Sequence, residues 1–175
     1  MHLQPTLENN IVSIRPLLES DFDSLYQVAS DKEIWEQHPS HDRYQKEQFN
    51  KLFIKSMRSG AALLIIDQQS SKVIGSSRYQ MAPNDSKTLE IGWSFLAKAY
   101  WGGKYNMAIK QLMIDHAFRH YEQVVFHIAK VNTRSIKAVE KLGATKITDA
   151  ELSHLLKNPK QNWTYIIYKR DWLSK

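Results

Sequence analysis

Residues 87 to 131 place a strand pattern, a glycine pair, a helical pattern and a second strand pattern in direct succession. The stretches KTLEIGWSFL (87–96) and VVFHIAKV (124–131) are typical of β-strands. Between them, residues at helical spacing would form one mostly apolar helix face, at Ile109, Leu112, Met113, His116, Ala117 and Tyr121. Because a strand-helix-strand crossover is almost always right-handed, the two strands should lie side by side and parallel. This predicts an α/β chain organised around one parallel strand pair.

Further strand patterns predict that the rest of the sheet is mostly antiparallel. The ranges 61–67 and 72–82 flank a polar turn as in a hairpin, and the strand before the glycines extends this hairpin into a meander. The stretch 11–17 alternates apolar and polar residues, as expected of a first strand. The chain closes with 144–152 and 162–170, and the last of these alternates like an edge or penultimate strand.

Three more helices are predicted from apolar periodicity and from residues that favour helix ends, over 19–29, 44–59 and 132–142. Ser20 is a suitable N-cap for the first helix, and Gly60 suits a left-handed cap after the second. Asn132 or Thr133 would cap the third helix, which Gly143 ends.

No repeat, low-complexity tract or linker divides the 175 residues, so we expect one domain over residues 1–175. Apolar residues make up 42% and charged residues 24%, which is typical of a folded globular protein. The absence of cysteine excludes a disulfide, a thiol nucleophile and a cysteine-ligated zinc site. The sequence shows no signal-peptide pattern and no apolar run of membrane-spanning length, which favours a cytoplasmic location without membrane association.

The formal net charge of +6 favours a polyanionic partner, such as nucleic acid, acidic lipid or a phosphorylated cofactor. The basic residues are spread along the chain, and their densest group is interleaved with the helical core pattern of 132–142. Because no basic arm stands out, the charge distribution does not favour a nucleic-acid-binding protein.

The turn AYWGGKYN, between the first strand and the helix, has the parts of an anion-binding site. Unpaired backbone N–H groups and the positive end of the helix dipole converge at a helix start, and glycine lets phosphate oxygens approach the backbone. The stretch contains neither a P-loop nor a dinucleotide-binding fingerprint. The residues alone therefore leave two interpretations open, a diphosphate site and ordinary turn geometry.

A second motif, VNTRSIKAVEKLGA at 131–144, opens the next helix. With the glycine turn, it resembles the GNAT superfamily of acetyl-coenzyme A dependent N-acetyltransferases, whose N-x-x-S-x-x-x-x-E-K-L-G segment is matched by Asn132, Ser135, Glu140, Lys141, Leu142 and Gly143. The run IGWSFLAKAYWGGKYN is similar to the branch of ribosomal-protein N-terminal acetyltransferases (RimJ/RimL type). The resemblance covers Val12 to Tyr168. It implies a mixed, mostly antiparallel sheet of about seven strands with flanking helices, in which the fourth and fifth strands are parallel and splayed.

The resemblance also implies acetyl-coenzyme A (acetyl-CoA) as co-substrate and no metal. The pyrophosphate would lie against Trp101, Gly102, Gly103, Lys104, Tyr105 and Asn106. The family loop commonly reads Q/R-x-x-G-x-G/A, and here Lys104 and Asn106 replace its two small residues. Pantetheine would pair with the strand edge at Phe95 and Leu96, and Asn132 would hydrogen-bond the pantetheine amide.

Direct transfer from a thioester to an amine needs a base for the amine and a proton for the departing thiolate. By position in the family, Glu90 would be the base, and Ser135 would protonate the sulfur or orient the thioester. Each residue has an alternative interpretation. Glu90, between Leu89 and Ile91, would simply face solvent, and Ser135 would only satisfy N–H groups of the first helical turn.

The segment KEIWEQHPSHDRY lies between the first two predicted helices, which is the position that lines the acceptor pocket in the family. Trp35, Glu36 and His38 are therefore candidate acceptor contacts, with loop packing as the alternative. His116 and His120 lack the glutamate of a zinc motif, so they do not indicate a metal site. The acceptor would be a primary amine, on a protein N-terminus or a small molecule, and the chain a monomer or homodimer. A non-catalytic acyl-CoA binding module is the alternative function.

Overall fold

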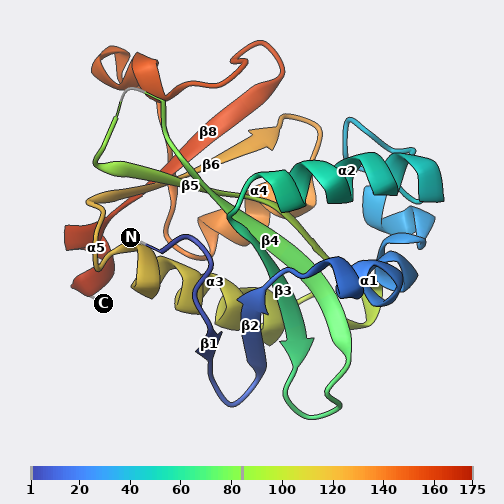
Figure 1. The fold of residues 1–175 in the computed structure, drawn as a ribbon. Helices are drawn as coiled ribbons and strands as arrows, with labels where there is room; N and C mark the ends of the chain where they lie inside the picture. Colours follow the sequence, from blue (N-terminus) through green and yellow to red (C-terminus); the bar gives the residue numbers. More distant parts are fainter. Residues whose placement is uncertain (1, 84, 175) are drawn as a thin grey trace.

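One sheet of eight strands forms the centre of the molecule, in the order β1-β2-β3-β4-β5-β6-β8-β7 (Figure 1). The computed structural model describes residues 2–83 and 85–174. The strands are β1 Leu7–Glu8, β2 Val12–Pro16, β3 Ala62–Asp67, β4 Val73–Met81, β5 Thr88–Leu96, β6 Gln123–Ala129, β7 Thr145–Lys146 and β8 Asn162–Tyr168. Neighbouring strands are antiparallel except β5 and β6, which are parallel. This confirms the mixed sheet, with eight strands rather than about seven because the short β1 pairs with β2 at one edge.

Helices cover both faces of the sheet (Figure 1). They are α1 Phe22–Ala29, α2 Lys46–Arg58, α3 Lys104–Ala117, α4 Thr133–Glu140 and α5 Lys169–Leu173, with 3-10 turns η1 Glu19–Asp21, η2 Lys32–Trp35, η3 Lys98–Tyr100 and η4 Ala150–Leu155. On one face, α2 buries Phe49 against Leu64 of β3. On the other face, α3 buries Met113 against Leu89 of β5. Each such buried side chain contributes roughly 1.5–3 kcal/mol. No helix among the described residues is both long and apolar enough to cross a membrane.

Most of the predicted helix ends are confirmed. Gly60 after α2 and Gly143 after α4 have φ of 60° and 88°, the left-handed conformation that glycine adopts without strain. Asn132 caps α4, because its side-chain oxygen accepts a hydrogen bond from the Ser135 backbone N–H at 3.1 Å.

The prediction that Ser20 caps the first helix is wrong. The 3-10 turn η1 precedes α1, which begins at Phe22. The Asp21 carboxylate accepts two hydrogen bonds from Arg15, at 2.7 and 2.8 Å, and a third from the Leu18 backbone N–H at 2.8 Å. This charge-assisted pairing across the β2–α1 connection fixes the turn around Asp21, so α1 begins after the turn instead of at Ser20.

The C-terminal part adds structure that the sequence patterns did not predict. β8 lies between β6 and β7. It is therefore the penultimate strand, which is one of the two positions, edge or penultimate, predicted for it. Within the range 144–152, however, only Thr145 and Lys146 form a strand. The 3-10 turn η4 and the helix α5 were not predicted. The indole of Trp172 in α5 donates to Asp115 of α3 at 2.6 Å, which ties the end of the chain to this helix.

The parallel strands β5 and β6 stay paired only at their beginnings (Figure 1). The register runs from Thr88 opposite Gln123 to Glu90 opposite Val125. Beyond these residues β5 continues through 91–96 and β6 through 126–129 with no pairing between them in the described chain. We call this opening the fork. It confirms the splayed parallel pair and leaves a strand edge that an extended ligand can pair with.

Candidate active site

Glu90 is the last residue of β5 that pairs with β6, so it lies where the fork begins. Leu89 and Ile91 belong to the core beneath α3, and the alternation of the strand turns Glu90 to the opposite face. There the residue is only 5% exposed. The alternative in which Glu90 simply faces solvent is therefore wrong.

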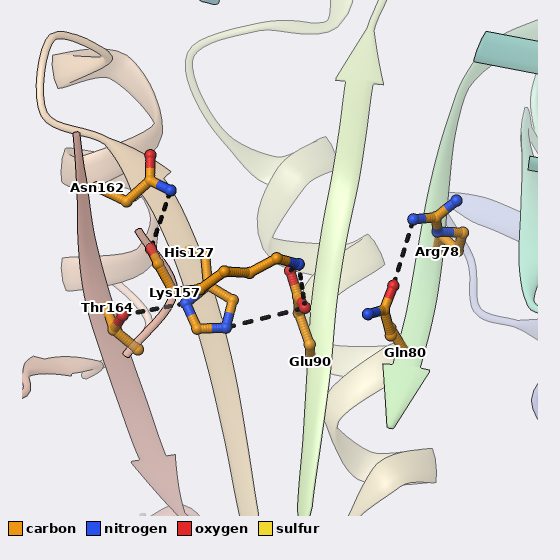
Figure 2. Close-up of polar contacts among 7 residues, drawn as sticks. All are labelled: Arg78, Gln80, Glu90, His127, Lys157, Asn162 and Thr164. Carbon is orange, nitrogen blue, oxygen red and sulfur yellow. Dashed lines mark hydrogen bonds and ion pairs between the residues drawn. The ribbon is translucent and has the colours of Figure 1, made fainter. Parts of the chain in front are cut away.

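Two basic side chains reach Glu90 from β6 and the loop before β8 (Figure 2). Lys157 Nζ lies 3.1 Å from Oε2, and His127 Nε2 lies 3.8 Å from the same oxygen. Burial raises the pKa of Glu90, and the charges of Lys157 and Arg78 oppose this rise. Burial, aided by the Lys157 charge, lowers the pKa of His127 to about 4, so this imidazole is neutral at pH 7. A buried carboxylate with a raised pKa is suited to accept a proton.

A bulge in β5 follows Glu90. The register of β5 against β4 shifts there, because β5 carries one extra residue. Trp93, in the bulge, has a φ of 51°, a left-handed conformation that bulky side chains rarely adopt. The guanidinium carbon of Arg78 lies 3.3 Å from the centroid of its ring, and Lys157 Nζ lies 4.9 Å from it. The bulge thus holds an indole against two cations beside Glu90.

Lys110 of α3 lies on the other face of the same bulge and is 5% exposed. Its ammonium group donates to the hydroxyls of Ser77 and Ser94, and it forms no ion pair with a carboxylate of the described residues. Burial lowers the pKa of Lys110 to about 7. The unfolded chain keeps this proton up to about pH 10. Between about pH 7 and pH 10 the unfolded state therefore binds more protons than the folded state, so the free energy of unfolding rises with pH.

Replacing Lys110 with methionine is expected to raise the free energy of unfolding, because the buried charge is removed. At pH 6 the increase in the free energy of unfolding should be roughly 1.4 kcal/mol for each unit by which burial lowers the pKa of Lys110. The increase should be smaller at pH 9. Urea unfolding of both proteins at the two pH values measures this difference. An equal stability gain at pH 6 and pH 9 would show that Lys110 carries no shifted titration.

The predicted acceptor contacts lie at the end of η2 and just after it. Trp35 is 2% exposed, donates from Nε1 to the Ala29 carbonyl at 2.7 Å, and lies 5.1 Å from Phe95 between ring centroids. The His38 ring is 5.7 Å from Trp35, and burial lowers the pKa of His38 to about 4. The structure buries Trp35 against Phe95 on the α1/α2 face, places His38 beside Trp35, and leaves Glu36 exposed.

The glycine turn leads directly into α3. Gly102 has a φ of 83°, which favours glycine, and Gly103 precedes α3 without any side-chain cap. A Cβ added at either glycine would meet nothing within 4 Å. Lys104 is exposed at the first helical position. Because the first N–H groups of a helix have no partner inside it, the open turn fits a phosphate group.

Tyr105, the next residue of α3, is engaged elsewhere. Its hydroxyl donates to Asp67 of β3 at 2.9 Å, and its ring packs edge-on against Tyr100 with centroids 4.7 Å apart. The side chain of Tyr105 therefore serves packing between α3 and β3. A contact of this residue with phosphate would come from its backbone N–H group.

Trp101 closes part of the fork in this structure. Its indole N–H donates to the carbonyl of Leu96 at 2.8 Å, and the guanidinium carbon of Arg134 lies 3.8 Å from the centroid of its ring. Arg134 also donates to the Ile34 carbonyl at 3.0 Å, which ties α4 to η2. Since Leu96 is one of the residues predicted to pair with pantetheine, a ligand that uses its carbonyl must replace the indole.

The remaining predicted cofactor residues lie at the start of α4. Asn132 is the N-cap of this helix and Ser135 lies in its first turn. Because α3 follows β5 and α4 follows β6, both helix starts lie at the open end of the fork. The structure thus brings the residues 101–106 and Asn132 with Ser135 to one end of the fork, and Glu90 to the other.

Three residues of this site, Arg78, His127 and Lys157, were not predicted from the sequence. Arg78 and His127 carry a signal, since each is a polar residue inside an otherwise apolar strand, VIGSSRYQM and VVFHIAKV. Lys157 lies in a polar loop and carries none. As for metals, no three or more His, Cys, Asp or Glu side chains in the described ranges are placed to hold an ion.

The family model of the acetyltransferase (GNAT) domain matches residues 12–145. No curated protein matches the chain. A GCN5-related N-acetyltransferase from Brucella melitensis superposes with a TM-score of 0.81 at 17% identity, over 97% of this chain and 81% of that chain. Spermidine N-acetyltransferase from Vibrio cholerae, in complex with CoA and spermine, gives 0.68 at 15% identity, over 94% and 99%. Mycobacterium smegmatis RimJ, in complex with CoA-disulfide, gives 0.67 at 13% identity, over 96% and 88%.

The fold and the fork define an acyltransferase of the GNAT type, and the family match covers most of the chain. The chain therefore belongs to the GNAT acetyltransferase family. These three solved structures are distant in sequence, so they establish the shared fold and do not identify the acceptor.

Proposed function

We propose that the chain is an acetyl-CoA-dependent N-acetyltransferase, a single domain over residues 1–175, that acetylates a primary amine by direct attack. The observation that carries this proposal is the fork, with the buried Glu90 at its closed end and two helix starts at its open end. A pantetheine arm can pair with the free edge of β5 like an added strand. The acceptor would then approach from the α1/α2 face, where Glu90 lies.

In this mechanism the amine nitrogen attacks the carbonyl carbon of the thioester. Glu90 accepts the proton that the nitrogen loses, directly or through a water, and its raised pKa suits it to this role. The bond between the carbonyl carbon and sulfur breaks, and the thiolate takes a proton to leave as the free thiol. Ser135, in the first turn of α4, is our candidate donor or orienting group at the sulfur.

The cofactor would be held along the fork and at its open end. Phe95 and Leu96 supply the strand edge, and Asn132 with Ser135 forms the opposite side. The open glycine turn, from Trp101 to Asn106, supports a diphosphate site at the start of α3. Lys104 would add a direct ionic contact, which compensates for the small residue that it replaces in the family loop.

The IGW strand and the aromatic-Trp-Gly turn support placing this chain with RimJ/RimL-type enzymes, so a protein N-terminus is one acceptor to test. The test begins with titration calorimetry of CoA, where we expect saturable binding. Release of free thiol from acetyl-CoA is then measured with a panel of amines and N-terminal peptides. Binding without turnover would favour the acyl-CoA binding module, and no binding at all would overturn the proposal.

A further inference from the structure

The acceptor side of the fork is lined by more cations than carboxylates. Arg78 of β4 and Lys157 of the loop before β8 flank Glu90 (Figure 2). Arg43, from the loop before α2, lies close enough to Arg78 that the positive charge of Arg78 affects its titration. Among the described residues, the charged partner of Glu90 is Lys157, because His127, at 3.8 Å, is neutral at pH 7.

Arg78 is the unusual member of this group, because it is buried and forms no direct ion pair in the described chain, although the charge of Glu90 acts on it. The residue is 8% exposed, and its Nε atom is buried without a hydrogen-bond partner among the described residues. One terminal nitrogen makes a long hydrogen bond of 3.4 Å to Gln80. The side chain lines a pocket between the sheet and helices α1 and α2, together with Trp93 and Phe95. An unpaired donor inside such a pocket is costly unless a ligand satisfies it.

Arg43 lies near Arg78 and beside Trp35. Its guanidinium carbon lies 5.5 Å from the centroid of Trp35, and one of its nitrogens lies 3.1 Å from Nε2 of His38. Burial lowers the pKa of Arg43, and the charge of Arg78 lowers it further. The charge of Asp42 raises the pKa of Arg43 more than the charge of Arg78 lowers it, but Asp42 is exposed and forms no ion pair with Arg43 in the described chain. Two neighbouring arginines that repel each other favour the binding of an anion close to both.

The neighbouring histidines do not change this balance at pH 7. Burial lowers the pKa of His38 and His127 to about 4, so both are neutral. Glu90 therefore stands as one carboxylate beside Arg78 and Lys157, with Arg43 near Arg78. This arrangement disfavours a polycationic acceptor such as spermine, the ligand named for the Vibrio cholerae structure.

We propose that the acceptor is a primary amine that carries a carboxylate within a few bonds of the nitrogen, and that Arg78, supported by Arg43, binds this carboxylate. The inference rests on the proposed acetyl transfer and specifies its substrate class. The two guanidinium groups would hold the carboxylate, which directs the amine towards Glu90. Both a free amino acid and a peptide that begins with aspartate or glutamate present this chemistry.

The test compares matched acceptors in the acetyl-CoA thiol-release assay. One pair is L-glutamate against its diamide, the second is a C-terminally amidated peptide with N-terminal aspartate against the same peptide with asparagine, and spermine is the cationic arm. We expect the carboxylate member of at least one pair to exceed its amide in kcat/KM by roughly 30-fold or more, and to exceed spermine. The pair that shows the preference for the carboxylate over the amide tells whether the acceptor is a free amino acid or a peptide.

Substitution of Arg78 identifies the residue responsible. Arg78→Gln should remove most of the preference, mainly through KM for the carboxylate acceptor, while the amide acceptor changes little when both are measured above the acidic limb of Glu90, whose pKa the Arg78 charge also lowers. Arg78→Lys should restore part of the preference, and Arg119→Gln on exposed α3-terminal surface should leave both acceptors unchanged. Thermal unfolding checks that the variants are folded. The comparison of acceptors with the wild-type protein tests the inference even if a variant fails to fold.

The outcomes separate this inference from the proposed function. Turnover of amines without preference for the carboxylate, or faster turnover of spermine, overturns the inference and leaves the acetyltransferase standing. If CoA binds but no amine reacts, binding of L-glutamate and of the aspartyl peptide to the CoA complex is measured by calorimetry. If neither binds, the carboxylate-acceptor inference is overturned. Failure to bind CoA overturns the proposed function itself.

Discussion

Replacing Glu90 with glutamine is expected to lower kcat for acetyl transfer by about 10²–10⁴-fold, with little change in the affinity for CoA. The amide has the same size and keeps the packing beside Gly92, but it cannot accept a proton. In the wild type, the rate should fall as the pH drops through the raised pKa of Glu90, because the protonated carboxyl group cannot act as a base. The variant should lose this acidic limb of the profile of kcat/KM against pH.

Two further variants make this test specific. Lys157→Gln keeps the base but removes the charge that opposes the rise in the pKa of Glu90, so the acidic limb should move to higher pH. Glu122→Gln removes an exposed carboxylate that pairs with Lys169 away from the fork, and should leave the profile unchanged. If Glu90→Gln retains the wild-type rate and limb, another group is the base.

The parts of the site that depend on local sequence could be predicted. The position of Glu90 on its strand follows from the strand pattern, and the start of α3 follows from the glycine pair. The cap formed by Asn132 follows from its place before an apolar helical run. In each case the physical cause lies within a few residues of the feature, so the local sequence pattern predicts it.

The electrostatics around Glu90 could not be predicted, because they depend on segments far apart in the chain. His127 comes from β6 and Lys157 from the loop before β8, and both reach Glu90 only through the β5-β6-β8 strand order. Whether a glutamate in an alternating strand faces solvent is decided by what covers that face. The same limit applies to Trp101, whose hydrogen bond to Leu96 depends on how the glycine turn folds back on β5.

Replacing Gly103 with aspartate is expected to weaken CoA binding by about 10- to 100-fold, because a carboxylate would compete with the diphosphate for the first N–H groups of α3. The substitution has room, since an added Cβ meets nothing within 4 Å. Gly103 also precedes α3 without a side-chain cap, and aspartate is a favourable N-cap. Stability should therefore stay equal or rise by a few tenths of a kcal/mol while affinity falls. Calorimetry of CoA and thermal unfolding measure the two effects on the same samples.

Gly103→Asn is the matched control, because asparagine has the shape and capping ability of aspartate without its charge. It should bind CoA more tightly than Gly103→Asp, and the gap should narrow at high salt, where ionic repulsion is screened. Equal affinity of the aspartate variant and the wild type would remove the diphosphate from the start of α3. Since Lys104 and Asn106 already depart from the family loop, such a result would place the phosphate contacts elsewhere along the fork and would leave the role of Glu90 intact.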